Sequence, residues 1–297
     1  ACDMMRPGYH FHKEGQPMQK LLSLISACVL AQPAAAQDRR PSHCFAIADA
    51  SPELNYLHKA TWNTPTADEF TVRLSYIDHS MYLIQSHGGI DVITDYTGFI
   101  GSVDLLPDVV TMNNAHDSHW TSFPDPDIPH VLEGWRQQGE PADYHLDLDE
   151  MLIRNVTTDI RDRFGGGTVI EDNNSIFIFE VAGLCIGHLG HLHHEPSDET
   201  YAAIGRLDVV MAAVDGGLTV DTPTMIRIIK RLRSSIVLPM HWFSRSSLDR
   251  FLAGVSDEFD VKRTGESGIE LSLRDLPSRP TVMVLEPAFL RLGSPAD

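Results

Sequence analysis

The sequence predicts an α+β fold in which helices pack outside two β-sheets. Short β-rich runs dominate the first half of the chain, and apolar runs alternate with helical segments in the second half. A meander of strands followed by helix–strand units is typical of two sheets with helices on their outer faces. The 297 residues are enough for one large domain or two small ones with a well-buried core. We expect a single domain over residues 37–297.

The strands of the predicted meander are separated by short turns. Residues 71–77, 81–86 and 90–96 are rich in Val, Ile, Tyr and Thr, and the segments between them read DHS and HGG. Such spacing predicts an antiparallel arrangement. Further strand candidates lie at 108–120, where an apolar run breaks into a polar loop, and at 151–160, 174–188, 207–217 and 234–243.

Helices are expected at residues 198–204, 222–233 and 246–255. The first follows the capping sequence SDET, and the second begins with threonine and proline, which suit a helix start. For the third, Ser246 or Ser247 is the expected cap. Residues 122–143 are rich in proline and polar side chains and predict a long loop near the site.

The N-terminal segment has the order of a secretory signal. A lysine precedes an apolar stretch over residues 21–30, and three alanines at 34–36 precede a glutamine. This order predicts cleavage after Ala36, and the apolar stretch is too short to span a bilayer. We therefore expect residues 1–36 to be an extension and signal peptide, and the protein to be periplasmic or secreted. A lipid anchor at Cys28 and a disordered or amphipathic tail are the alternatives.

The charge balance limits the partners that the protein can bind. The formal net charge is −18, from 41 acidic and 23 basic residues. No basic stripe is present to neutralise phosphates, so we expect no nucleic-acid partner. We expect a small-molecule substrate and no integral membrane span, and the sequence does not indicate an oligomeric state.

Cleavage at the predicted place would leave two cysteines, Cys44 and Cys185. Export permits a disulfide between them, although two cysteines are not a disulfide framework. Cys185 lies inside an apolar strand-like run, where a buried free thiol fits equally well. Both states therefore remain open.

Histidines gather where the strand-like runs end. The histidines concerned are His79 after LSYID, His116 and His119 after DVVTMNNA, His188, His191, His193 and His194 within GLCIGHLGHLHHEP, and His241 after IVLPM. Strand ends at one edge of a sheet sandwich can converge, and convergent neutral imidazoles are the usual ligands of zinc. His193 and His194 precede a helix start, so we expect them to be exposed or to support a ligand.

Several of these stretches together resemble the metallo-β-lactamase fold. YIDHSMYLIQSHGGIDVITDYTG resembles the family's opening, PDVVTMNNAHDSHWT stands at its metal loop, and FEVAGLCIGHLGHL stands where an apolar strand precedes Gly-Asp-Thr. RLDVVMAAVDGG and IKRLRSSIVLPMHW are similar to the closing part. The resemblance covers roughly residues 70 to 245 and is closest to the branch with lactonase-like and phospholipase-D-like members. It implies a four-layer αββα sandwich of two mixed β-sheets flanked by helices.

The chain departs from the family's metal motif, His-x-His-x-Asp-His. Asn114 stands at the first histidine and Ser118 at the aspartate, whereas His116 and His119 match. His191 stands where the family has an aspartate that bridges two metals. A carboxylate can hold two cations, but a neutral imidazole donates one lone pair to one metal. We therefore expect one ion rather than two.

The resemblance implies a set of metal ligands and supporting residues. We expect Zn²⁺, with Mn²⁺ or Fe²⁺ as alternatives, and one coordination position left for water. Asp159 and Asp117 are the candidate proton acceptors, while Asp95, Asn114 and His79 would orient ligands through hydrogen bonds. The predicted metal ligands are His116, His119, His191 and His241, with His188 as a weaker candidate.

The resulting functional hypothesis is an exported, metal-dependent hydrolase. A metal-activated water would attack an ester, lactone, amide or phosphoester of a small molecule. The alternative is a metal-binding or ligand-binding protein that kept the fold and lost hydrolysis, which Asn114, Ser118 and His191 favour. Fold alone does not choose between these classes.

Overall fold

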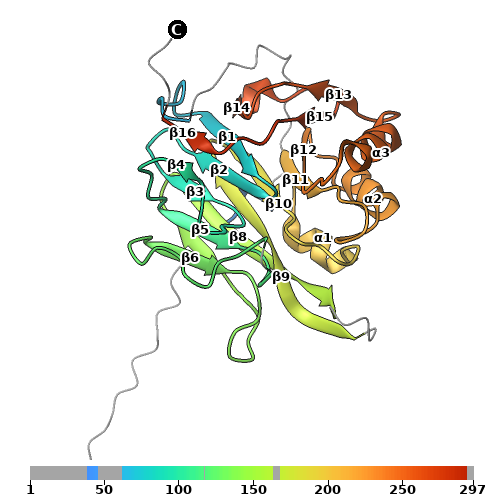
Figure 1. The fold of residues 1–297 in the computed structure, drawn as a ribbon, viewed down its shortest axis with the longest axis horizontal. Coiled ribbons are helices and arrows are strands. Elements are labelled where there is room, and N and C mark those ends of the chain that lie inside the picture. Colours follow the sequence, from blue (N-terminus) through green and yellow to red (C-terminus); the bar gives the residue numbers. More distant parts are fainter. Residues whose placement is uncertain (1–38, 46–61, 117, 163–167, 293–297) are drawn as a thin grey trace, which may run out of the picture. The chain divides into compact units, whose positions relative to one another are not determined.

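The computed structural model describes residues 39–45, 62–116, 118–162 and 168–292. The predicted extension and signal peptide over residues 1–36, with Cys28, lies outside these residues. The described chain forms two large mixed β-sheets that face each other, with helices beside the second sheet (Figure 1). The predicted fold class, two mixed sheets with flanking helices, is confirmed.

The first sheet has six strands and begins with the predicted meander. β1, β2 and β3 pair antiparallel, and β5 and β6 then join in parallel. The predicted third strand, 90–96, is shorter than expected, and the predicted long loop 122–143 contains the edge strand β6. The order across the sheet is β14 (Gly268–Ser272), β1 (Thr71–Asp78), β2 (Met81–Gln85), β3 (Asp91–Ile93), β5 (Val109–Met112) and β6 (His130–Glu133).

The second sheet has eight strands, antiparallel at one side and parallel at the other. The predicted single strand 174–188 is a hairpin, because Ala182 and Gly183 turn the chain with positive φ angles of 53° and 77°. A pair of short strands, β4 (Gly101–Ser102) and β16 (Leu290–Arg291), stands apart. The order is β13 (Asp260–Arg263), β15 (Thr281–Val284), β12 (Ile236–Met240), β11 (Val209–Ala213), β10 (Leu184–His188), β9 (Val169–Val181), β8 (Met151–Arg161) and β7 (His145–Asp147).

All three predicted helices are present. They are α1 (Asp198–Ile204), α2 (Thr222–Leu232) and α3 (Arg245–Val255), with short 3₁₀ turns η1 (His43–Phe45) and η2 (Leu273–Asp275). The cap of α3 is Ser244 and not Ser246 or Ser247, because the Ser244 side chain accepts from the Ser247 amide. Among the described residues, no helix combines the length and apolar character needed to cross a membrane.

Side chains that alternate between the two faces of the second sheet form two hydrophobic clusters. On β9, Phe177 and Phe179 face the cluster between the two sheets, and Ile176 and Ile178 face the cluster under the helices. A strand points successive side chains to opposite faces, so the apolar segment 176–179 of one strand serves both clusters. In the described part of the chain, loop residues that include Trp62, Trp120 and Trp135 cover the outer face of the six-stranded sheet.

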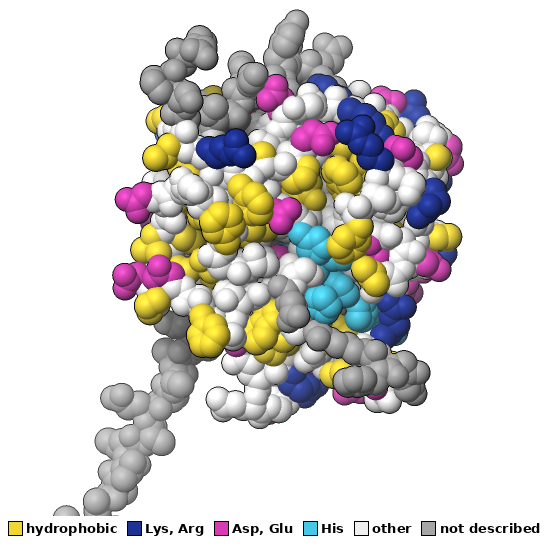
Figure 2. All heavy atoms as spheres, viewed as in Figure 1, with side chains coloured by type: hydrophobic (Ala, Val, Ile, Leu, Met, Phe, Trp, Pro, Cys, Tyr) yellow, Lys and Arg dark blue, Asp and Glu magenta, His cyan; other side chains and the backbone are white. Residues whose placement is uncertain are grey.

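The strand directions bring the histidines to one edge. β10, β11 and β12 run parallel, so the segments after them, which carry His191, Asp215 and His241, leave the sheet at the same side. The loop after β5, with His116 and His119, meets them from the opposite sheet. Figure 2 shows the histidines gathered on one face of the molecule, beside apolar side chains.

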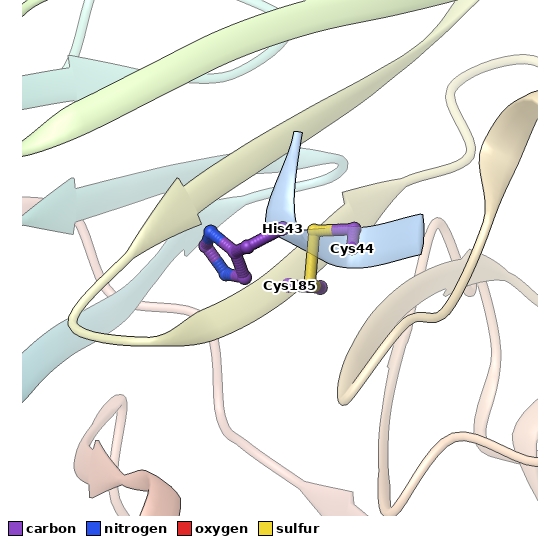
Figure 3. A group of neighbouring side chains, drawn as sticks. All are labelled: His43, Cys44 and Cys185. Atoms are coloured by element: carbon purple, nitrogen blue, oxygen red, sulfur yellow. A yellow bond between two sulfur atoms is a disulfide. The ribbon is translucent and has the colours of Figure 1, made fainter. Parts of the chain in front are cut away.

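Cys44 and Cys185 form a disulfide that ties η1 to β10 (Figure 3). Both residues are buried, and they are separated by 141 positions. His43 lies beside them, but bonded sulfurs carry no thiolate that could hold a metal. Of the two states that the sequence leaves open, the structure has the disulfide.

Candidate metal centre

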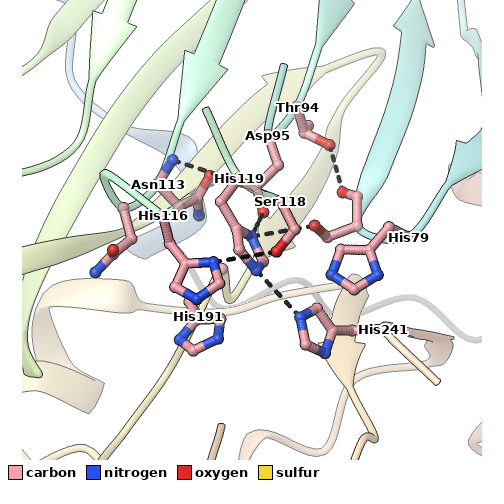
Figure 4. Close-up of polar contacts among 12 residues, drawn as sticks. His79, Thr94, Asp95, Asn113, His116, Ser118, His119, His191 and His241 are labelled. Carbon is pink, nitrogen blue, oxygen red and sulfur yellow. Dashed lines mark hydrogen bonds and ion pairs between the residues drawn. The ribbon is translucent and has the colours of Figure 1, made fainter. Parts of the chain in front are cut away.

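Three histidines bring ring nitrogens together at the edge where the two sheets meet. His79 follows β1, His119 follows β5 and His241 follows β12, and one ligand atom from each lies within 4.8 Å of the others. Nε2 of His119 is 3.1 Å from Nε2 of His241 (Figure 4). The His79 ring lies over the His241 ring, with 3.9 Å between centroids.

Carboxylates set the tautomers of two of these rings. Nδ1 of His119 is 2.5 Å from Oδ2 of Asp95, and Nδ1 of His241 is 3.0 Å from Oδ2 of Asp215. Burial raises the pKa of Asp95 to about 6, which leaves it ionised at neutral pH. Hydrogen bonds from His241, Thr219 and Gly217 outweigh burial and hold the pKa of Asp215 well below its usual value. An ionised carboxylate can only accept a hydrogen bond, so each ring carries its proton on Nδ1 and its lone pair on Nε2.

This donor set fits a divalent cation. Two Nε2 lone pairs that face each other at 3.1 Å repel, unless a cation contacts both. Ligands about 2.0–2.1 Å from a tetrahedral ion are separated by roughly 3.3 Å, close to the observed spacing. The third ring adds a nitrogen, because Nε2 of His79 is buried without a hydrogen-bond partner among the described residues.

Burial keeps two rings of the cluster, His79 and His119, neutral. It lowers the pKa of His79 to about 3, with the neighbouring His241 and His119 adding to the effect, and it holds the pKa of His119 well below the usual range. A neutral imidazole is the form that binds a metal. The site is therefore prepared for a cation without first losing protons.

We predict that the metal-free protein loses stability as the pH falls below about 6.5. Burial depresses the folded-state pKa of five histidines, whereas the unfolded chain takes up protons on them. Because the unfolded state then binds more protons, acid favours unfolding. Asp95, Asp91 and Asp208, whose pKa values burial raises, work in the opposite direction, but they are three groups against the five, which are His79, His119, His188, His191 and His193. Urea unfolding with a chelator at pH 8, 6.5 and 5 measures this, and equal or greater stability at pH 5 would contradict it.

Three site residues have a left-handed backbone. His79, Asp95 and His241 have φ angles of 48°, 44° and 58°, a region that residues other than glycine rarely occupy. The backbone N–H of His241 donates to the carbonyl of His79 at 2.8 Å and joins the two sheets at this point. Such conformations persist where the surrounding structure holds them, and they cluster at functional sites.

A cavity of about 560 Å³ opens beside the three histidines. Its polar wall includes His116, His191 and His241, and its apolar wall includes Leu218 and Phe243. Leu218 is 61% exposed and Phe243 64% exposed. Among the described residues, the lining consists of Asn114, His116, Ser118, Ile160, Arg161, Asp162, His191, His193, Gly217, Leu218, His241 and Phe243.

The structure places the predicted ligands in different roles. His119 and His241 contribute to the three-histidine group, and His79, expected to orient a ligand, contributes a nitrogen of its own. The rings of His116 and His191 stack at 5.1 Å beside the group but do not belong to it. Nδ1 of His116 contacts Ser118 Oγ at 3.2 Å.

His188 does not offer a free nitrogen to the site. Its Nε2 donates to the Ser80 carbonyl at 2.8 Å, and its Nδ1 accepts from the Gly190 amide at 3.3 Å. Gly190 has φ of 61°, and a Cβ there would lie 2.3 Å from the Asn113 amide nitrogen. In this tight turn, the two hydrogen bonds of His188 support the loop, and His191 farther along the loop lines the cavity.

Of the two carboxylates proposed as proton acceptors, Asp159 lies within the described residues. Asp159 Oδ1 accepts from the Asp172 amide at 3.0 Å, and Asp159 is not among the residues that line the cavity. Its carboxylate is engaged within the β8–β9 ladder, and its role as a proton acceptor stays a prediction. Asp117 lies outside the described residues. Asn114 lines the cavity, and its amide donates to the Asn173 carbonyl at 2.8 Å.

Asp215 and Ser80 have roles that the sequence analysis missed. Asp215 fixes His241, and Ser80 Oγ lies 3.1 Å from Nδ1 of His119. The position of Asp215 directly after a parallel strand, at the edge that also carries His241, is a signal that could have found it. Ser80 gives no comparable signal, because a serine after a strand is common in turns.

We predict that Asp215→Asn lowers zinc affinity by about 10- to 100-fold. The amide would no longer hold the proton of His241 on Nδ1, so the Nε2 lone pair would not be fixed toward His119. Zinc titration with a competing chelator measures the change. Asp249→Asn, on the exposed face of α3, is the matched control and should bind zinc as the wild type does. Unchanged affinity in Asp215→Asn would contradict the assigned role.

Together, the two facing mixed sheets, the helices beside the second sheet and this histidine cluster define a two-sheet sandwich with a candidate metal site at one edge. The family model for the beta-lactamase superfamily domain matches residues 73–241, which is more than half of the chain. The chain therefore belongs to this family, within the metallo-β-lactamase superfamily. The lactonase-like branch expected from the sequence stays a prediction.

Solved structures support the fold assignment. A Thermotoga maritima structure, described as a zinc-dependent hydrolase of the metallo-β-lactamase superfamily, is 22% identical, with a TM-score of 0.52 over 73% of this chain and 99% of that one. A Parabacteroides distasonis structure, described as a metal-dependent hydrolase, is 11% identical, with a TM-score of 0.50 over 73% and 93%. No curated protein matches the chain.

Proposed function

We propose that this protein is a metal-dependent hydrolase that acts on neutral carboxylic esters, lactones or amides of small molecules. The observation that carries the proposal is the 3.1 Å approach of the His119 and His241 Nε2 atoms, at the wall of a cavity large enough for a small substrate. Zinc is the favoured ion because the donor set is three neutral imidazoles. Mn²⁺ and Fe²⁺ are the alternatives.

The chain's own residues divide the work at this site. His79, His119 and His241 would hold the ion, and Asp95 and Asp215 keep two of these rings in the correct tautomer. A bound divalent cation supplies Lewis-acid polarisation and lowers the pKa of water toward neutrality. Three protein ligands leave a coordination position for water or substrate, as catalytic zinc sites do.

The cavity wall favours a carbonyl substrate over a phosphoester. Arg161 is the only Lys or Arg among the described lining residues. Its Nη2 is committed to the loop at 217–219, where it donates to the carbonyls of Leu218 at 3.0 Å and Thr219 at 2.7 Å. A phosphoester site normally presents free cationic groups to the phosphate oxygens. The net charge of −18 also disfavours anionic substrates.

A metal-binding protein without hydrolytic activity is the second candidate. Asn114, Ser118 and His191 favour it, because they stand where the resembling family has metal ligands. To separate the two functions, we would measure bound metal in the purified protein and screen esters, lactones, amides and phosphoesters with and without chelator. Chelator-sensitive turnover of the carbonyl substrates is expected. Bound metal without any such turnover would establish the second candidate instead.

We predict that the double variant Leu218→Ser/Phe243→Ser raises KM for esters with an apolar acyl group by about tenfold. These two exposed side chains line the cavity. Their replacement by serine removes apolar contact area with the substrate. Zinc affinity should stay unchanged, because neither residue contributes to the three-histidine group. Kinetics on short and long acyl esters measure the effect. Equal KM values in the variant and the wild type would show that the apolar wall does not select the substrate.

We also propose that the protein is exported. The buried Cys44–Cys185 disulfide supports this, because disulfides persist in oxidising compartments, and the secretory order of residues 1–36 agrees with it. Expression in a bacterial host, followed by fractionation and N-terminal sequencing, tests the proposal. Periplasmic protein that begins at Gln37 is expected, and uncleaved cytoplasmic protein would contradict it.

A further inference from the structure

We propose that His191 presents an Nε2–H group to the cavity as a hydrogen-bond donor for the substrate's carbonyl oxygen, and that His193 fixes it in this state. His191 would then be a catalytic residue and not a metal ligand. The assignment of its proton rests on geometry alone. Only the identity of the acceptor, a carbonyl oxygen, rests on the proposed function.

A chain of hydrogen bonds determines where each proton lies. The backbone N–H of Arg161 donates to Nδ1 of His193 at 2.7 Å. Because a backbone amide can only donate, Nδ1 of a neutral His193 carries the lone pair and Nε2 carries the proton. That Nε2 lies 2.7 Å from Nδ1 of His191 and therefore donates to it. Nδ1 of His191 is thus the acceptor, and the proton of neutral His191 is on Nε2.

The same hydrogen bonds make both rings neutral, because an Nδ1 atom that accepts a hydrogen bond carries no proton. Burial agrees with this: it lowers the pKa of His193 to about 4 and holds the pKa of His191 far below its usual value. Arg161 and His194 lower the pKa of His193 further. Near neutral pH, neither ring carries a second ring proton.

The proton of His191 thus lies on the opposite ring nitrogen from the protons of His119 and His241. Carboxylates at Nδ1 leave a lone pair on Nε2 of His119 and His241, whereas the relay through His193 leaves a proton on Nε2 of His191 and makes it a hydrogen-bond donor. Its ring lies 4.7 Å from the His119 ring, between centroids, and lines the same cavity. A fixed donor beside the reacting centre stabilises negative charge that develops on a carbonyl oxygen.

The position of the proton can be read directly in the metal-free protein. Long-range ¹H–¹⁵N correlation spectra of ¹⁵N-histidine protein distinguish the two tautomers of each ring. We expect His191 to carry its proton on Nε2 in the wild type and in His193→Gln, whose amide can both accept and donate. In His193→Leu the relay is lost, and the Nδ1–H tautomer of His191 should become populated. A wild-type His191 with its proton on Nδ1 would overturn the proposal.

Metal binding and kinetics provide the second test. Zinc affinity of His191→Gln and His191→Leu should stay within about threefold of the wild type, whereas His119→Gln loses binding. With an ester substrate, kcat should fall about 100-fold in His191→Leu with little change in KM, and His191→Gln should recover part of it. Loss of zinc binding in both His191 variants would make His191 a ligand and refute the proposal.

These readouts separate this proposal from the proposed function. His130→Gln is the matched control, because His130 pairs with Val109 at the start of β5, away from the loop that follows its end. If the wild type hydrolyses no substrate, the spectra and the zinc affinities still decide the role of His191. If the tautomer is wrong while chelator-sensitive hydrolysis is present, the inference fails and the proposed function stands.

Discussion

Zinc affinity is expected to fall by at least about 100-fold when His119 is replaced by glutamine or His241 by asparagine. Removal of a group that merely orients a ligand already costs 10- to 100-fold, and these variants remove a ligand itself. His241 has a φ of 58°. It is therefore replaced by asparagine, which tolerates a left-handed backbone better than most residues. Chelator-sensitive hydrolysis should disappear with the zinc.

Competition titration with a chromophoric chelator measures the affinity, and circular dichroism shows that each variant remains folded. His130→Gln again serves as the control, because it changes a histidine outside the cluster. Both ligand variants should bind zinc much more weakly than this control. If His119→Gln and His241→Asn bind zinc as tightly as His130→Gln does, the metal is held elsewhere.

The double variant Cys44→Ser/Cys185→Ser is expected to lower the free energy of unfolding by about 3–5 kcal/mol. The disulfide closes a loop with a sequence separation of 141 residues, which restricts the unfolded chain strongly. It also anchors η1 beside buried Glu180, whose carboxylate accepts from the His43 amide at 3.0 Å and from Arg154 at 3.0 Å. Loss of the disulfide should therefore weaken the attachment of η1 to the second sheet.

Urea unfolding with and without a reductant measures this effect. The reductant should destabilise the wild type by a similar amount and leave the double variant unchanged, which provides an internal control. A difference below about 1 kcal/mol between the oxidised and reduced wild type would show that the disulfide adds little. The metal centre lies beyond the other end of β10. The double variant should therefore keep its zinc affinity at low urea.

Local patterns were sufficient for most elements of the fold. The β-rich runs at 71–77 and 81–86, with a short turn between them, predicted the meander. The SDET sequence at 197–200 and the threonine–proline start at 222 predicted α1 and α2. The largely apolar run at 174–188 concealed a hairpin, because Gly183 is the single turn-marking residue in its turn and Ala182 beside it gives no such signal. The third helix started one residue earlier than expected, where Ser244 reaches the free amides.

The site was harder to predict, because its chemistry depends on pairs of residues distant in sequence. Strand ends placed His119, His191 and His241 in one region. The different proton positions on these rings follow from Asp95, Asp215 and the Arg161 amide, and only the fold brings those groups to each imidazole. His79 was expected to support a ligand, but its Nε2 is buried with no hydrogen-bond partner among the described residues and lies with the group.

The most direct test of the central claim is anomalous diffraction at the zinc edge, from crystals of the protein grown with zinc. We predict one anomalous peak per chain, about 2.0–2.1 Å from a ring nitrogen of each of His79, His119 and His241, with no protein atom in one coordination position. Two peaks, a peak bonded to His116 or His191, or no peak among these histidines would contradict the account.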